Sequence, residues 1–302
     1  IGLVRVYAYS GSSFQQRGQD LYGNAFSDQC GYSISLNTAG NVIALGSPKW
    51  DLPGSGSFDN RGITRVFVWD GSSWVQRGAN IQGDFPGGES GSAVSLSADG
   101  SVVAIGAPLA NAGGTDRGSV RVLAWNGTAW AKRGNNMNGE SNNDEFGTSV
   151  ALNENGNVVA IGAPFNDGTA TSSSDDRGHV RVFAWGTSDW VQRGADIDGE
   201  NAGDESGTSV AITADGLTVA IGSPYNDGTT GSSSDNRGHV RVFDWSGSTA
   251  WTKRGSNIVG EAANDLSGTS VALTADGLYV SIGAPDNDGD TGSNSDNRGH
   301  VR

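Results

Sequence analysis

The chain repeats itself about every sixty residues, and this period constrains its fold more than any other feature. An arginine in a V-R-V or T-R-V segment marks each copy, and successive markers are 60, 56, 60, 60 and 61 residues apart. The markers are Arg5, Arg65, Arg121, Arg181, Arg241 and Arg302. The spacing of 56 comes from one loop, where the short copy has just Leu109 to Asp116. Insertions confined to a loop are typical of stacked structural repeats.

Each unit predicts four β-strands and no helix. In the central unit, apolar β-branched segments run from Thr148 to Leu152 and from Val158 to Pro164, and the short Gly-containing turn between them predicts a hairpin. The segment Val180 to Trp185 has apolar groups on both of its faces, which predicts a strand covered on both sides. A fourth segment starts at Trp190, which should meet Trp185 across a second hairpin. We therefore predict an all-β β-propeller with one four-stranded blade per sixty residues.

The copies add up to five blade equivalents within one repeat domain. A shared blade, built from both ends of the chain, would close a five-bladed ring and hide its edges. However, Gly2 to Arg5 and Gly299 to Arg302 have the same place in the repeat and would compete for one position. The alternative is therefore an excerpt of a longer, seven-bladed array, and we favour the ring. The expected complete blades are 31–89, 90–145, 146–205 and 206–266, and the shared blade is 1–30 plus 267–302.

Charge and composition exclude several classes of partner. The net charge is −14 at pH 7, and such a surface repels the phosphates of nucleic acids. No apolar run approaches the roughly 18 residues that span a bilayer, so direct membrane insertion is not expected. A single cysteine, Cys30, rules out an internal disulfide framework. The chain has neither an initiator Met nor a signal peptide, which we interpret as a processed or excerpted sequence.

Two short motifs flank the first hairpin of each unit. Phe146-Gly147 precedes it and Gly162-Ala163-Pro164 follows it, and the second motif recurs as GAP or GSP in all five copies. In these motifs the chain resembles the FG-GAP repeat, the blade unit of integrin α-subunit propellers and related surface proteins. The resemblance covers the whole chain. It implies a β-propeller at the cell surface or outside the cell.

The resemblance does not carry over the calcium sites of that family. Calcium-binding FG-GAP blades usually have a D-x-D-x-D-G loop between the first two strands, whereas here most copies have one acid there, such as Asp215. Calcium needs six to eight oxygen ligands. Acidic residues gather instead in the loop after the GAP motif and after the fourth strand, where they either bind Ca²⁺ or cap their own turns. The candidate ligands are Asp167, Asp175, Asp176, Asp196, Asp198, Glu200, Asp204, Asp227, Asp235, Asp286, Asp288 and Asp290.

Other candidate sites have simpler interpretations. His179, His239 and His300 share one repeat position, which favours a structural role, and Cys30 stands where Phe146 stands in its copy, which favours a buried apolar role. The recurrent arginines are explained by stacking on tryptophan and by local salt bridges. Asn126-Gly127-Thr128 is the sole glycosylation sequon, and it lies in a predicted exposed turn.

These observations favour a non-enzymatic, extracellular or cell-surface protein. It would act in adhesion, matrix or filament assembly through its blade loops, with protein or glycan partners or with copies of itself, and with Ca²⁺ as the one cofactor considered. The alternative is a glycan-binding lectin with one pocket per blade. A distant third is a hydrolase or lyase, which would need a non-repeated acidic or histidine cluster, and the sequence shows none.

Overall fold

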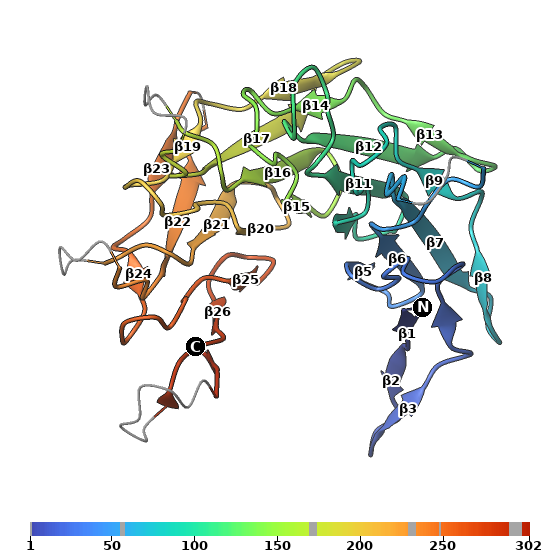
Figure 1. The fold of residues 1–302 in the computed structure, drawn as a ribbon. Coiled ribbons are helices and arrows are strands. Elements are labelled where there is room, and N and C mark those ends of the chain that lie inside the picture. Colours follow the sequence, from blue (N-terminus) through green and yellow to red (C-terminus); the bar gives the residue numbers. More distant parts are fainter. Residues whose placement is uncertain (1, 55–57, 169–173, 229–233, 248, 290–297) are drawn as a thin grey trace.

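A computed structural model of the chain describes residues 2–54, 58–168, 174–228, 234–247, 249–289 and 298–302. These residues form small antiparallel sheets in a five-bladed β-propeller arrangement, without an α-helix (Figure 1). The predicted all-β propeller is confirmed. Within the described ranges, no helix has the length and apolar character needed to cross a membrane.

Four consecutive segments each form a five-stranded sheet, and we call them blades 1 to 4. Blade 1 has β5 (Ile34–Leu36), β6 (Val42–Ser47), β7 (Ile63–Trp69), β8 (Trp74–Gln76) and β9 (Ile81–Gln82). Blade 2 has β10 (Ala93–Leu96), β11 (Val102–Ala107), β12 (Ser119–Trp125), β13 (Trp130–Lys132) and β14 (Met137–Asn138). Blade 3 has β15 (Ser149–Leu152), β16 (Val158–Ala163), β17 (His179–Trp185), β18 (Trp190–Gln192) and β19 (Ile197–Asp198). Blade 4 has β20 (Ser209–Ile212), β21 (Thr218–Ser223), β22 (His239–Trp245), β23 (Trp251–Lys253) and β24 (Ile258–Val259).

The expected fourth strand is split into two short strands. In blade 3, β18 pairs with the end of β17 and β19 pairs with its start, and the Arg193-Gly194 step separates them. The equivalent glycine of blade 2, Gly134, has a φ of +79°, and a Cβ there would lie 2.9 Å from the rings of Trp185 and Trp190. The outer strand therefore breaks where it must contact the tryptophans of the next blade.

The predicted tryptophan pairs meet across their hairpins. Their ring centroids lie 5.3 to 5.5 Å apart in the four blades. In blade 3, the indole N–H of Trp190 donates to the carbonyl oxygen of Arg133 in blade 2 at 2.7 Å. The Arg133 guanidinium lies 4.5 Å from the ring centre of Trp185. The arginine before the glycine thus stacks on the next blade, as predicted.

The hydrophobic core lies between the blades. Alternation along the strands directs Val159 and Phe183 of blade 3 toward blade 2, whereas Val180 and Val182 face blade 4. The third strand of a middle blade is therefore covered on both faces, which confirms the prediction made from its pattern. Every blade depends on its neighbours for burial of its apolar side chains.

The two sequence motifs meet at each blade interface. The Gly207 amide donates to the Gly222 carbonyl oxygen of its own blade at 3.0 Å, and the Gly207 carbonyl oxygen lies against Gly162 of the preceding blade. A Cβ on Gly162 would lie 2.0 Å from the Gly207 carbonyl oxygen, so a side chain has no room there. This contact explains why both motifs keep their spacing. Membership of the FG-GAP family stays a prediction.

The two ends of the chain form sheets of their own. The N-terminal sheets pair β1 (Leu3–Val4) with β4 (Leu21–Tyr22) and β2 (Tyr7–Tyr9) with β3 (Phe14–Gln16). The C-terminal sheet has β25 (Ser270–Leu273), β26 (Val280–Ala284) and β27 (His300–Val301).

The expected blade shared between 1–30 and 267–302 is therefore not assembled, and the ends lie on opposite sides of an open arc (Figure 1). The reason is in the register. His300 pairs with Ala284 on β26 as His239 pairs with Ser223 in blade 4, so the place of the third strand is taken.

Candidate functional site

Three glutamates lie at equivalent positions just before the innermost strands. The first strands of neighbouring blades, β10, β15 and β20, lie side by side along the inside of the arc (Figure 1). Glu89, Glu145 and Glu205 precede them and have φ values of 52°, 51° and 49°. Residues other than glycine rarely adopt this left-handed conformation, and Gln29 and Leu266 adopt it too at the equivalent positions of the end copies, so it is a feature of the repeat.

Two of these glutamates have strongly shifted pKa values. Burial raises the pKa of Glu145 to about 7, and the charges of Asp116 and Glu89 add to the shift. Burial, Asp176 and Glu145 raise the pKa of Glu205 to about 7 as well. Glu89 forms an ion pair with Lys49. Glu145 and Glu205 are thus two carboxyl groups of adjacent blades whose pKa values lie near neutral pH.

The backbone holds each of these glutamates beside an acid of the preceding loop. The Glu145 amide donates to the Asp116 carbonyl oxygen at 3.1 Å, and the Glu205 amide donates to that of Asp176, also at 3.1 Å. Sequence reasoning proposed Asp176 as a calcium ligand and did not identify the glutamates. A signal was present, since acids occupy this position in three consecutive copies while Gln29 and Leu266 occupy it at the ends.

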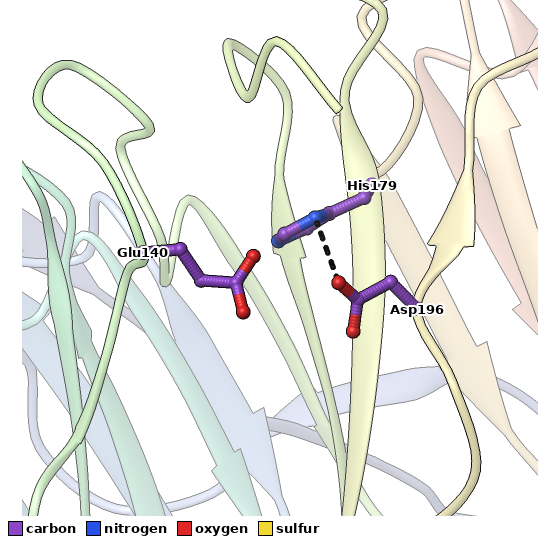
Figure 2. Close-up of side chains that lie close together, drawn as sticks. All are labelled: Glu140, His179 and Asp196. Carbon is purple, nitrogen blue, oxygen red and sulfur yellow. Dashed lines mark ion pairs between the residues drawn. The ribbon is translucent and has the colours of Figure 1, made fainter. Parts of the chain in front are cut away.

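A second cluster lies between blades 2 and 3. Glu140 follows β14, His179 is the first residue of β17, and Asp196 immediately precedes β19. Figure 2 shows the two carboxylates pointing toward the imidazole from different segments. One ligand atom from each residue lies within 4.8 Å of the other two. In the part of the chain that the structure describes, this is the one group of three or more His, Cys, Asp or Glu side chains with such spacing.

The His179 side chain is buried without a hydrogen bond. It is 1% exposed, and neither ring nitrogen has a hydrogen-bond partner among the described residues. Its Nδ1 lies 3.9 Å from Asp196 Oδ2, which is too long for a hydrogen bond. Burial, with the nearby Arg181 charge, lowers the pKa of His179 to about 4, so the imidazole is neutral at pH 7.

The two carboxylates of this cluster are held by their neighbours. The Gln192 amide donates to Asp196 Oδ1 at 2.6 Å and leaves Oδ2 on the side of His179. Arg181 Nη1 lies 3.4 Å from Glu140 Oε1, and its guanidinium stacks 4.3 Å from the centre of the Phe146 ring. Burial raises the pKa of Glu140, against the opposing effect of Arg181.

The corresponding position in blade 4 is built differently. Asn257 stands where Asp196 stands, and its amide nitrogen lies 3.3 Å from His239 Nδ1 and 2.7 Å from Glu200 Oε2. Lys253 stands where Gln192 stands, and its Nζ lies 3.3 Å from Glu200 Oε1. An amide and an ammonium group therefore complete this second histidine site.

The sequence showed no non-repeated partners for the histidines, yet Glu140 and Asp196 lie beside His179, and the structural role predicted for the histidines stays a prediction. The partners of His179 come from two different repeat units, so a scan for motifs within one unit misses them. The signal was the residue two positions after the Arg-Gly step, which is Asn80, Asn136 and Asn257 in three copies but Asp196 beside His179. Cys30, by contrast, is buried as predicted.

In the predicted calcium loops after the GAP motif, aspartate side chains accept hydrogen bonds from backbone amides of the same loop. Asp167 Oδ1 accepts hydrogen bonds from the amides of Asp175 and Asp176. Asp227 does the same for the amides of Asp235 and Asn236. Asp175 forms an ion pair with Arg177 at 2.9 Å, and Asp235 forms one with Arg237 at 2.8 Å. These contacts agree with the turn-capping interpretation.

The remaining candidates do not gather into one site. Asp204 accepts hydrogen bonds from the amides of Glu200 and Asn201 and from the side chain of Asn226. Asp198 pairs with His179 in the β-ladder. Asp286 and Asp288 are half-buried in the loop after β26, and Asp290 lies outside the described residues. Calcium binding stays a prediction.

The glycosylation candidate lies where the sequence placed it. Asn126 is exposed in the turn between β12 and β13. Its side-chain oxygen accepts hydrogen bonds from the amides of Thr128 and Ala129. Glycosylation at Asn126 stays a prediction.

A pocket of about 230 Å³ adjoins the Asp196 side of the second cluster. It lies between blades 3 and 4 and is lined by Asp196, Asp198, Arg241 and Trp251 among others. It combines two carboxylates, a guanidinium and an aromatic ring. This composition suits a small polar molecule with several hydroxyl groups.

Comparison with known proteins places the fold among propellers. No protein-family model and no curated protein sequence matches the chain. In structure it is similar to the periplasmic gluconolactonase of Pseudomonas aeruginosa, with a TM-score of 0.57 and 16% identity over 92% of this chain and 70% of that one. It is also similar to the hydrazine synthase of Kuenenia stuttgartiensis, with a TM-score of 0.52 and 12% identity over 89% and 70%. At these identities the likeness shows the fold alone.

The gluconolactonase overturns one expectation. Sequence analysis predicted a protein that is not an enzyme, largely because packing explains the residues that recur in every repeat. A propeller of similar structure carries the name of an enzyme, so this architecture does not argue against catalysis. The physical reason is that a repeated framework leaves single loop positions, such as Asp196, free to differ between blades.

Proposed function

We propose that the chain is a hydrolase that opens a cyclic ester of a polyhydroxylated small molecule, with Glu145 and Glu205 as its acid–base pair. The observation that carries this proposal is their arrangement, two half-buried glutamates on left-handed backbone at equivalent positions of adjacent blades. Carboxyl groups with pKa values raised to near neutral pH are suited to acid–base catalysis.

The proposed chemistry uses one of the two carboxyl groups in its ionised form and the other in its protonated form. The ionised carboxylate accepts a proton from water as the water oxygen attacks the ester carbonyl. The protonated carboxyl donates its proton to the ring oxygen as the carbon–oxygen bond breaks. The product is a hydroxy acid, and the pair ends with the same number of protons as it began. The name of the structurally similar gluconolactonase supports a lactone as the substrate class.

A pH-stat assay tests the proposal, with glucono-1,5-lactone and simpler lactones as substrates. We expect acid release above the rate in buffer alone, with a bell-shaped pH dependence centred near pH 7. Glu145→Gln and Glu205→Gln should each lower kcat by about a hundredfold or more. Glu89→Gln is the matched control: because Glu89 is paired with Lys49, the substitution should leave kcat at the pH optimum nearly unchanged, and it should shift only the pH profile, since the charge of Glu89 contributes to the pKa of Glu145. A wild-type rate equal to that of buffer would exclude this substrate class.

Carbohydrate binding without turnover is a second candidate, supported by the pocket at Trp251. Trp251→Ala should abolish glycan binding, whereas Trp190→Ala, at the equivalent position of blade 3, should retain it. If both variants retain glycan binding, this pocket is not the binding site. A role in adhesion or assembly, and a location outside the cell, stay predictions from the FG-GAP resemblance.

A further inference from the structure

We propose that Glu140, His179 and Asp196 bind a divalent transition-metal ion, and that zinc fits this donor set best. The inference is independent of the proposed hydrolase activity, since it concerns other residues. One imidazole nitrogen and two carboxylate oxygens, contributed by neighbouring blades, are a common ligand set for zinc and related ions. Calcium prefers oxygen ligands alone, which disfavours it here.

The buried imidazole is the first argument for a ligand. A buried polar group normally has a hydrogen-bond partner, and leaving one without a partner is costly. Both nitrogens of His179 lack such a partner within the described ranges, yet Nδ1 faces the carboxylate of Asp196. An ionised carboxylate offers only acceptors. A cation between the two groups satisfies both of them.

The orientation of the carboxylates is the second argument. Gln192 fixes Asp196 through Oδ1, so Oδ2 stays on the imidazole side. Hydrogen bonds that orient a ligand from outside the metal's own contacts are typical of metal centres. Arg181 neutralises part of the charge of Glu140, and the group keeps a net negative charge when His179 is neutral.

The ligand atoms need only a small movement. Tetrahedral zinc with bonds of about 2.0–2.1 Å holds its ligand atoms about 3.3 Å apart. His179 Nδ1 and Asp196 Oδ2 are separated by 3.9 Å. Glu140 and Asp196 are the more exposed partners, with side-chain exposures of 48% and 28%, so they can close around an ion while the imidazole stays fixed. Three protein ligands leave a position for water or for a bound molecule.

The corresponding histidine site in blade 4 lacks the residues that favour a metal ion in blade 3. There Asn257 offers an amide to His239, and Lys253 supplies a positive charge next to Glu200. Both features disfavour a metal ion. Asp196 and Gln192 are therefore the two residues that distinguish the proposed site from its neighbour in the same chain.

Isothermal titration of the full chain with Zn²⁺, in excess calcium to occupy weak surface sites, tests the inference. We expect one site per chain, and Co²⁺ should give a visible absorption band at the same stoichiometry. Asp196→Asn copies the residue at Asn257, so it should fold, and it should weaken Zn²⁺ binding by at least about tenfold. Asp20→Asn makes the same change at the equivalent position beside Leu3 and should have no effect.

A gain-of-site variant completes the test. Lys253→Gln combined with Asn257→Asp rebuilds the blade 3 arrangement around His239 and should add a second Zn²⁺ site. No Zn²⁺ binding by the wild type would overturn the proposal. Equal binding by wild type and Asp196→Asn would also overturn it, since the ions would then occupy other carboxylates. A double variant with no second site would refute the role given to Asp196 and Gln192.

Discussion

At the scale of single residues, position in the blade decides what a side chain does. Glu89 and Glu145 have the same place in the repeat and the same backbone conformation. Lys49 pairs with the first of them, whereas Asp116 and Glu89 repel the charge of the second. His179 and His239 also share one place in the repeat but have different neighbours, Asp196 for the first and Asn257 for the second. Chemical differences between copies thus come from one or two neighbours rather than from the framework.

The raised pKa of Glu145 predicts a pH-dependent stability. Its folded-state pKa of about 7 exceeds the ordinary value of 4.5, so the folded state holds the proton more tightly than the unfolded chain does. This group therefore destabilises the fold as pH rises from 4.5 through 7. Glu145→Gln should raise the free energy of unfolding by about 1 kcal/mol at pH 8, after discounting for solvent screening.

Thermal denaturation at two pH values measures this effect. The gain in Tm for Glu145→Gln should be clear at pH 8 and nearly absent at pH 5. Glu89→Gln should show no such gain at pH 8, because it loses the ion pair with Lys49. An equal gain at both pH values would mean that the substitution acts through packing rather than through charge.

At the scale of the strands, close backbone contacts join neighbouring blades. The third strand of each blade packs against both neighbouring blades. The GAP glycine of one blade, Gly162, lies in close contact with the FG-position glycine of the next blade, Gly207. The position of both motifs could be predicted from sequence. Their mutual contact could not, because Gly162 and Gly207 belong to different repeats and nothing local links them.

Gly162→Ala tests the importance of that contact. The φ of Gly162 is not in the left-handed region, so the new methyl group conflicts with its neighbours rather than with its own backbone. Its Cβ would lie 2.0 Å from the carbonyl oxygen of Gly207. We expect a loss of about 2–3 kcal/mol in the free energy of unfolding, measured by urea denaturation.

Gly283→Ala is the matched control for that variant. Gly283 has the equivalent place on β26, but the atom nearest to a Cβ there is the side-chain oxygen of Ser270, which can rotate away. We expect a loss of less than about 1 kcal/mol. Similar losses in both variants would show that the backbone contact with the next blade is not the cause.

At the scale of the whole molecule, stability is shared between neighbours. Blades 2 and 3 are covered on both sides, whereas the sheets of β2–β3 and β25–β27 each lie at one end of the arc (Figure 1). Large aromatic side chains at the N-terminal end are accordingly exposed, among them Tyr9 at 63% and Phe14 at 70%. Local opening should therefore be easier at the two ends than in the middle.

Hydrogen exchange of the 302-residue chain tests this gradient. Amides of β16 and β17 should exchange slowest, and those of β2, β3 and β25 should exchange faster by several orders of magnitude. Uniform protection along the chain would instead indicate one cooperative unit, held together by contacts between the two ends.

The repeat by itself determined the strands, their order within a blade and the pairing of tryptophans, because these depend on local alternation and on turn residues. It also indicated that the blades would be covered on both faces. The break in the fourth strand and the separate sheets at the ends depended on contacts with other units, so the pattern within one unit did not predict them.

Only the tertiary structure brought together the groups on which the two proposals rest. Glu140, His179 and Asp196 come from three segments that the stacking of blades 2 and 3 brings together. The pKa values of Glu145 and Glu205 depend on burial and on charges from neighbouring loops. Both properties arise from contacts between repeats, and the sequence of one repeat does not indicate which residues of the next repeat will lie beside it.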